Sequence, residues 1–132
     1  MSVLGIGTDI VKIQRMQTAV QRSGRGFLEK IFVQRELEQA RSCTDFVIYL
    51  ATRFAGKEAI FKAFGTGWNT GVKLTEIEIA NGKFGEPVVL LSGRFSELAS
   101  QRNVEKVLLS VSYDTEYAIG FAVLLGRNQT GT

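Results

Sequence analysis

The alternation of hydrophobic and polar residues predicts strands at both ends of the chain and helices in its first half. Residues 3–10 alternate with a period of two, as in a strand with two different faces, whereas residues 11–22 repeat their hydrophobic positions every three to four residues. The same comparison along the chain predicts strands over 3–10, 76–79, 88–91, 107–112 and 117–125, helices over 11–22, 34–41, 46–64 and 95–102, and one or two helical turns at 27–32.

Residues 46–64 form the longest predicted element. Thr44 or Asp45 can cap its start, and Gly65 is expected to end it. Its hydrophobic residues form a stripe at helical spacing, made of Val47, Leu50, Phe54 and Phe61.

The order of the elements, one strand, then helices, then mostly strands, indicates the α+β class. The length of 132 residues suits a single domain, which we expect to occupy residues 1–125, followed by a polar, frayed tail at 126–132. No hydrophobic run approaches the roughly 20 residues that span a bilayer. The first residues lack the basic region and long apolar run of a signal peptide. We therefore expect a cytoplasmic protein with no membrane partner.

The composition excludes several classes of enzyme. There is one cysteine and no histidine, so a zinc, haem or copper site is not expected, and a Ser-His-Asp or Cys-His arrangement is impossible. Acid and base chemistry must come from carboxylates, lysines, tyrosines or metal-bound water. The formal net charge of +3 weakly favours acidic partners.

Two carboxylates and a lysine are the strongest candidates for chemistry. Asp9 ends a glycine-spaced strand, and by itself it suits a cap for the following helix. Glu58 and Lys62 are four residues apart, which suits an ordinary helical ion pair as well as a pair that lines a cleft. Arg53 and Lys57 form a basic edge on another side of the same predicted helix. Together, the two acids and Lys62 suit a hard cation held against a phosphate group.

The segment Gly65-Thr66-Gly67 looks like a phosphate-binding loop, but it follows the end of a helix. The dipole at that end is negative and repels anions. A phosphate there would therefore need cations, which Lys62 and a metal ion could supply. Read alone, the segment indicates only a helix stop.

The first predicted helix has a basic stripe of Lys12, Arg15 and Arg22, with Met16 and Phe27 close in sequence. Basic residues beside soft apolar ones suit docking to an acidic helix. A solvated surface is the simpler interpretation. A nucleic-acid-binding surface is a further alternative, although the basic residues are sparse and no known nucleic-acid motif is present.

Two segments resemble the holo-acyl-carrier-protein synthases of the 4′-phosphopantetheinyl transferase superfamily, over about residues 3–125. They are Gly5-Ile6-Gly7-Thr8-Asp9-Ile10-Val11, and Arg53-Phe54-Ala55-Gly56-Lys57-Glu58-Ala59 continued through Lys62 to Gly67. Supporting matches are Gly85-Glu86-Pro87, Ser110-Val111-Ser112 and Glu116-Tyr117-Ala118.

The resemblance implies an enzyme that moves 4′-phosphopantetheine from coenzyme A to a serine of an acyl carrier protein and releases adenosine 3′,5′-bisphosphate. Fatty-acid, polyketide and other carriers all offer such a serine beside an acidic helix. On this resemblance Asp9 and Glu58 would hold Mg²⁺, Lys62 would lie at the phosphates, and Glu58 or metal-bound water would take the serine proton. The residues implied in coenzyme A binding are Arg53, Lys62, Gly65, Thr66 and Tyr113.

The resemblance also implies an assembly and a docking surface. The family fold is a compact α+β unit, with a mostly antiparallel sheet against a long central helix, and it forms a homotrimer with active sites between subunits. The residues implied in carrier docking are Arg15, Met16, Arg22 and Phe27.

Two departures from the family pattern concern the nucleotide end of coenzyme A. The usual Ser-x-Ser/Thr-His is here Ser110-Val111-Ser112-Tyr113, and residues 41–45 lack the usual basic pair. Arg53 then remains the main candidate cation for that end. The alternatives to a transferase are a non-catalytic paralogue that only binds carrier protein, and a basic nucleic-acid-binding module.

Overall fold

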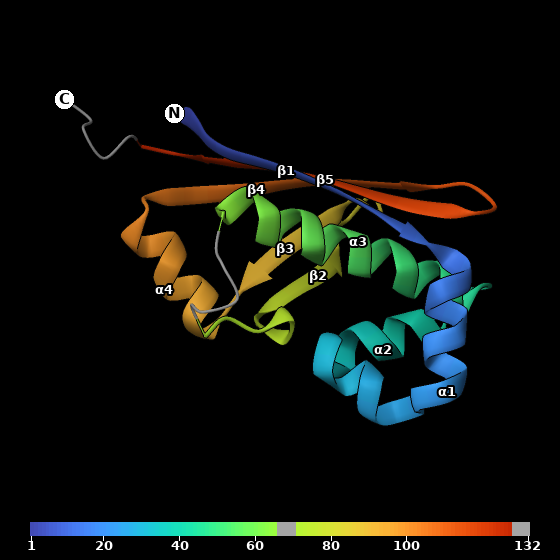
Figure 1. Ribbon diagram of the computed structural model, residues 1–132. Coiled ribbons are helices and arrows are strands. Elements are labelled where there is room, and N and C mark those ends of the chain that lie inside the picture. Colours follow the sequence, from blue (N-terminus) through green and yellow to red (C-terminus); the bar gives the residue numbers. More distant parts are fainter. Residues whose placement is uncertain (66–70, 128–132) are drawn as a thin grey trace.

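A long central helix, α3 (Phe46–Phe64), lies against one face of a three-stranded antiparallel sheet in the computed structural model (Figure 1). The structure describes residues 1–65 and 71–127. The other elements are β1 (Ser2–Lys12), α1 (Ile13–Ile31), α2 (Gln34–Arg41), the 3-10 turn η2 (Leu74–Glu76), β2 (Ile77–Asn81), β3 (Pro87–Leu91), α4 (Gly93–Gln101), β4 (Val104–Tyr113) and β5 (Tyr117–Gly126).

The sheet that α3 covers has the order β1-β5-β4, and both pairings are antiparallel. The strands β2 and β3 form a separate two-stranded antiparallel sheet. In Figure 1, α1 and α2 lie near one end of α3, while α4 lies near the other end. The expected α+β class, with an antiparallel sheet packed on a long central helix, is confirmed.

Most predicted elements are present, with small shifts at their ends. The strand β1 continues two residues further than expected, to Lys12, so α1 begins at Ile13. The predicted interval between the helix at 11–22 and the helical turns at 27–32 is a kink, where Gly24 has a φ of 57° and helix resumes beyond it. The strand β5 includes Gly126, which we expected in the tail. Residues 128–132 of that tail lie outside the described part.

Two expectations about helix caps have different outcomes. The Asp45 side chain accepts a hydrogen bond from the backbone N–H of Ile48, at 3.0 Å, and thereby caps α3. Asp9 caps no helix, because it lies inside β1 opposite Gly120 and the residue before α1 is Lys12. The interpretation of Asp9 as a helix cap was therefore wrong.

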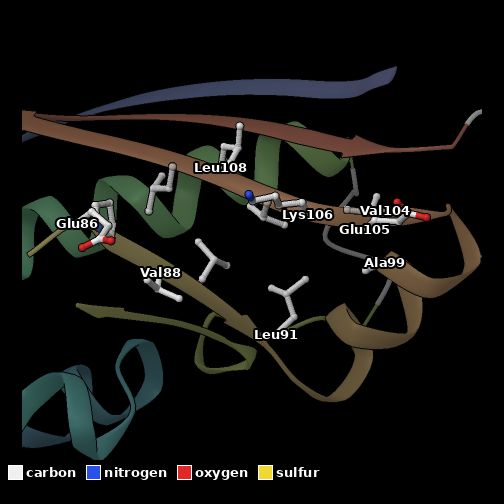
Figure 2. A pocket seen from close by; sticks show the side chains of 12 residues that line it. Glu86, Val88, Leu91, Ala99, Val104, Glu105, Lys106 and Leu108 are labelled. Atoms are coloured by element: carbon white, nitrogen blue, oxygen red, sulfur yellow. The ribbon is translucent and has the colours of Figure 1, made fainter. Parts of the chain in front are cut away.

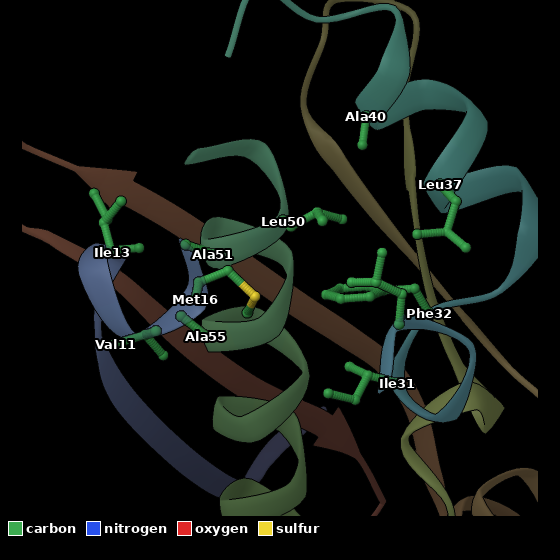
Figure 3. Packing of buried hydrophobic residues seen from close by; sticks show 12 residues of the cluster. Val11, Ile13, Met16, Ile31, Phe32, Leu37, Ala40, Leu50, Ala51 and Ala55 are labelled. Carbon is green, nitrogen blue, oxygen red and sulfur yellow. The ribbon is translucent and has the colours of Figure 1, made fainter. Parts of the chain in front are cut away.

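The hydrophobic core has two parts, and α3 belongs to both. One part joins α1, α2 and the first half of α3 (Figure 3). The other joins the second half of α3 to β2, α4 and β5. Because neighbours surround α3, 12 of its 19 residues are buried, rather than one stripe. None of the helices in the described ranges is long and apolar enough to cross a membrane.

The core also contains an ion pair between Glu36 of α2 and Lys57 of α3. The Lys57 Nζ lies 2.7 Å from Glu36 Oε1 and donates hydrogen bonds to the carbonyl oxygens of Leu74, at 3.1 Å, and Ile77, at 2.5 Å. Glu36 accepts from the backbone N–H groups of Val33 and Ile79, both at 2.9 Å. Burial lowers the pKa of Lys57, and the charge of Glu36 opposes that effect. Lys57 is thus a core residue, and the basic edge that we expected on α3 is not formed.

Removing one partner of this buried pair should strongly destabilise the protein. Lys57→Met leaves Glu36 as an uncompensated buried charge, and we expect the free energy of unfolding to fall by about 3–5 kcal/mol. The pair Arg35–Glu78, at 2.6 Å, is the control, because the Arg35 side chain is 76% exposed. Arg35→Met should cost about 0–1 kcal/mol. Urea denaturation at one fixed protein concentration measures both, and equal losses in the two variants would contradict the central role of Lys57.

Candidate active site

Glycines allow β1 and β5 to approach the backbone of α3 unusually closely. A Cβ atom at Gly7 would overlap the carbonyl oxygen of Ala59, and one at Gly5 would overlap that of Ala63. A Cβ at Gly120 would likewise meet the backbone of α3 at Ala55, at 2.5 Å. This glycine seam, made of Gly5, Gly7 and Gly120, requires residues without side chains. It brings the end of β1 that contains Asp9 beside the turn of α3 that contains Glu58 and Lys62.

The seam places Asp9 in an ion pair with Lys62, and the two charged atoms Nζ and Oδ1 are 2.8 Å apart. The hydrogen bond to Asp9 raises the pKa of Lys62. The sequence favoured Glu58 as the partner of Lys62, four residues earlier on the helix. No ion pair between Glu58 and Lys62 is formed among the described residues, so that expectation was wrong.

Glu58 lies near both members of this pair. Burial raises the pKa of Glu58, the negative charge of Asp9 adds to the increase, and Lys62 opposes it. The two carboxylates are therefore close enough to repel each other. The cluster therefore has two negative charges, from Asp9 and Glu58, and only one positive charge, from Lys62.

The carboxylates line a cavity of about 370 Å³ between β1, α1 and α3. Arg15 and Phe27, two of the residues implied in carrier docking, line the same cavity. Arg22 lies in an adjacent hollow of about 430 Å³ on α1, which shares Lys12 and Arg15 with the first. The structure thus brings the candidate docking residues next to the candidate catalytic ones.

Met16 is the exception in this set. It also borders the cavity, but only 2% of its surface is exposed and it packs in the core beside Val11 and Ala55 (Figure 3). Met16 lies on the apolar side of α1, and this side packs against α3 in the core. We expected Met16 to contact the carrier protein. The structure instead buries it, so that it supports the cavity wall from inside.

A second, larger cavity of about 920 Å³ lies around Arg53 and Tyr113, which the sequence assigned to the same ligand. Arg53 is only 7% exposed. Its guanidinium lies 4.2 Å from the centre of the Tyr49 ring and donates to Asn81 Oδ1 at 2.5 Å. Asn81 in turn donates to the Tyr49 hydroxyl at 3.3 Å. Arg53 Nε is buried and has no hydrogen-bond partner within residues 1–65 and 71–127.

Sequence reasoning missed Tyr49 and Asn81 as partners of Arg53. Tyr49 is one helical turn before Arg53, so its spacing was a usable signal. Asn81 comes from the end of β2, 28 residues later, and no sequence pattern links the two.

The end of α3 provides part of the predicted phosphate loop. Gly65 has a φ of 65° and its N–H donates to the carbonyl of Lys62 at 3.0 Å, so it stops the helix as expected. Thr66 lies outside the described residues. Arg102, which the sequence did not single out, donates a hydrogen bond to the carbonyl of Phe64. This arginine places a positive charge at the helix end whose dipole repels anions.

A third cavity, of about 590 Å³, separates β3 from β4 (Figure 2). Its walls are mainly aliphatic, and its charged lining residues are Glu86, Glu105 and Lys106. Within the described ranges, no group of three or more His, Cys, Asp or Glu residues could hold a metal ion. Metal binding in this part of the chain would therefore depend on fewer protein ligands, of which Asp9 and Glu58 are the candidates.

The family model of the 4′-phosphopantetheinyl transferase superfamily matches residues 5–122, and the chain belongs to this superfamily. Within it, the chain is 43% identical to a holo-[acyl-carrier-protein] synthase of Vibrio cholerae over 125 residues, which are 95% of this chain and 99% of that protein. It is 38% identical to the synthase of Desulforudis audaxviator, with 97% of each chain covered.

Solved structures agree with this assignment. The synthase of Neisseria meningitidis matches with a TM-score of 0.86 and 32% identity, over 94% of this chain and 99% of the other. The synthase of Helicobacter pylori, solved in complex with coenzyme A, matches with a TM-score of 0.80 and 29% identity, over 91% and 99%. The expected family, fold and enzyme class are confirmed.

Proposed function

We propose that this protein transfers the 4′-phosphopantetheine group of coenzyme A to a serine hydroxyl of an apo acyl carrier protein, with Mg²⁺, and releases adenosine 3′,5′-bisphosphate. The observation that carries the proposal is the cluster of Asp9, Glu58 and Lys62 beside the basic surface of α1. Family membership favours this activity over a nucleic-acid-binding module, and similar synthases have been solved with coenzyme A bound.

The cluster fits Mg²⁺. This ion binds one or two carboxylates and completes its shell with water and substrate phosphates. Asp9 and Glu58 supply two carboxylates that repel each other, and the Lys62 ammonium already acts there as a stand-in cation. Asp9 and Glu58 would hold the ion.

The transfer forms a bond from the serine oxygen to the phosphorus next to pantetheine, while the bond from that phosphorus to the bridging oxygen breaks. The bridging oxygen leaves with the adenosine phosphate. When bound, Mg²⁺ neutralises charge on the pyrophosphate. Lys62 orients and neutralises the same phosphates. Glu58, or a water molecule held at the site, would accept the serine proton.

The cavity around Arg53 suits the nucleotide end of coenzyme A. Its size accommodates a nucleotide, and Arg53 supplies a cation whose Nε–H group bonds to none of the described residues. Tyr113, 59% exposed, lines the same cavity and can donate a hydrogen bond. Gly65 and Thr66 would contact the phosphates from the end of α3.

We expect mass spectrometry to show an apo acyl carrier protein gaining one phosphopantetheine group after incubation with coenzyme A, Mg²⁺ and this protein. Asp9→Ala and Glu58→Ala should each slow transfer by at least about 100-fold, because each removes charge stabilisation at the phosphates. Glu38→Ala on the exposed side of α2 is the control and should transfer normally. Carrier binding without any transfer by the unmodified protein would instead identify a non-catalytic paralogue.

The carrier should dock on the basic surface of α1, next to the carboxylates. Arg15→Glu and Arg22→Glu should lower kcat/KM for the carrier by about tenfold or more at low salt, and less at high salt, because attraction to an acidic helix is screened. Coenzyme A affinity should stay unchanged. Lys106→Glu on β4 is the charge-matched control. An equal loss in all three variants would show that net charge matters rather than this surface.

The sheet face opposite α3 supports the expected homotrimer with sites between subunits. Large apolar side chains are exposed on all three strands, namely Ile6, Ile10, Leu108, Ile119 and Phe121. Ile10 lies opposite Ile119, and Val123 lies between Ile6 and Leu108. Contiguous apolar surface of this kind marks an interface.

Light scattering should therefore give three times the chain mass of 14.6 kDa. Phe121→Glu should dissociate the trimer, because it places charges in the apolar interface. Leu90→Glu on β3 is matched in exposure, 46% against 48%, and should leave the mass unchanged. A fully active monomer would rule the trimer out.

A further inference from the structure

The Lys62 ammonium lies against Asp9, one of the two carboxylates that would hold the cation of the proposed reaction. Its Nζ is 2.8 Å from Asp9 Oδ1. The Lys62 side chain is 55% exposed, whereas that of Asp9 is 16% exposed and extends from a strand fixed by the glycine seam. Lys62 is therefore the mobile member of the pair, and Asp9 is the fixed one.

Lys62 pairs with Asp9 rather than with Glu58. Glu58 is one turn away on the same helix and is the partner that helical spacing favours, yet it forms no ion pair or hydrogen bond with the described residues. One carboxylate of the cluster is thus neutralised by the protein, and the other stays unpaired at the cavity.

A divalent cation and the Lys62 ammonium compete for this position. Both are attracted to Asp9, but they repel each other, and this repulsion is strong in a half-buried site. The ammonium is on a flexible stem with several rotatable bonds, so it can leave. Once released, it is an unpaired cation at the mouth of the site, and a pyrophosphate offers it new oxygen acceptors.

We propose that Lys62 is the resting counter-ion of Asp9, that a divalent cation displaces it, and that the displaced ammonium then binds the pyrophosphate of coenzyme A. The inference rests on the proposed function, because it assumes that Asp9 holds the cation. It adds a coupling: the cation frees Lys62 for the pyrophosphate, and a pyrophosphate that draws Lys62 away opens Asp9 to the cation. By linkage the two effects are equal in size.

The test measures cation binding without coenzyme A or carrier protein, with Mn²⁺ as the probe and water proton relaxation as the readout. Mn²⁺ prefers the same oxygen ligands as Mg²⁺. Lys62→Gln removes the competitor, so we expect Mn²⁺ to bind about fivefold tighter, equivalent to about 1 kcal/mol. Lys12→Gln is the control, because Lys12 lines the same cavity without pairing to either carboxylate. Lys12→Gln should change the Mn²⁺ affinity by less than half as much as Lys62→Gln does.

A second measurement observes the lysine itself. In protein with ¹³C-dimethylated lysines, the NMR signal of Lys62, identified by its loss in Lys62→Gln, should shift when Mg²⁺ is added. The signal of Lys106 on β4 should stay in place. The proposed exchange would be overturned if the Lys62 signal did not shift when Mg²⁺ is added. It would also be overturned if Lys12→Gln and Lys62→Gln tightened Mn²⁺ binding equally.

The outcomes separate this inference from the proposed function. If the unmodified protein binds Mn²⁺, and Asp9→Asn abolishes that binding, the cation site stands. In that case, unchanged or weaker binding to Lys62→Gln overturns the exchange alone. If Asp9→Asn binds Mn²⁺ as well as the unmodified protein does, the cation site at Asp9 and the exchange are both wrong.

Discussion

The buried ion pair between Glu36 and Lys57 fixes the rotation of α3, and the rest of the site depends on that rotation. Charges in a core are costly unless every donor and acceptor is satisfied. Lys57 meets this condition in only one orientation, because its three acceptors come from α2, η2 and β2. Successive helical residues point about 100° apart. With Lys57 held toward the core, Glu58 and Lys62 must emerge on the side that faces β1.

The glycine seam supplies the second constraint, which is distance. Rotation alone would leave Asp9 and Lys62 far apart, because side chains normally separate the backbone of a helix from the backbone of the sheet on which it packs. Gly5 and Gly7 remove those side chains from β1, so the strand lies against the carbonyl groups of α3. The ion pair of Asp9 with Lys62 is the result of both constraints, and it involves residues 53 positions apart in sequence.

Local patterns predicted the elements well, because helix caps, glycine stops and strand alternation depend on near neighbours. Long-range contacts were harder to predict. Lys57 has the spacing of a surface lysine, and only Glu36 in another helix shows why it is buried. The partner of Lys62 was likewise misassigned, because spacing favours Glu58 while the approach of β1 favours Asp9. The family resemblance named Asp9, Glu58 and Lys62 together, but the reason for their proximity lies in the glycine seam.

The two ends of the proposed coenzyme A site differ in their electrostatic interactions. At the phosphate end, Asp9, Glu58 and Lys62 are charged, and their interactions change when a ligand brings charge. At the nucleotide end, Arg53 is the single cation among the described residues that line the cavity, and Tyr49 and Asn81 already hold it. The phenol of Tyr113 can donate a hydrogen bond but carries no positive charge. Charge-assisted hydrogen bonds are about twice as strong as neutral ones. Under the proposed function, electrostatic selection of the ligand is therefore concentrated at the pyrophosphate, where the proposed transfer would take place.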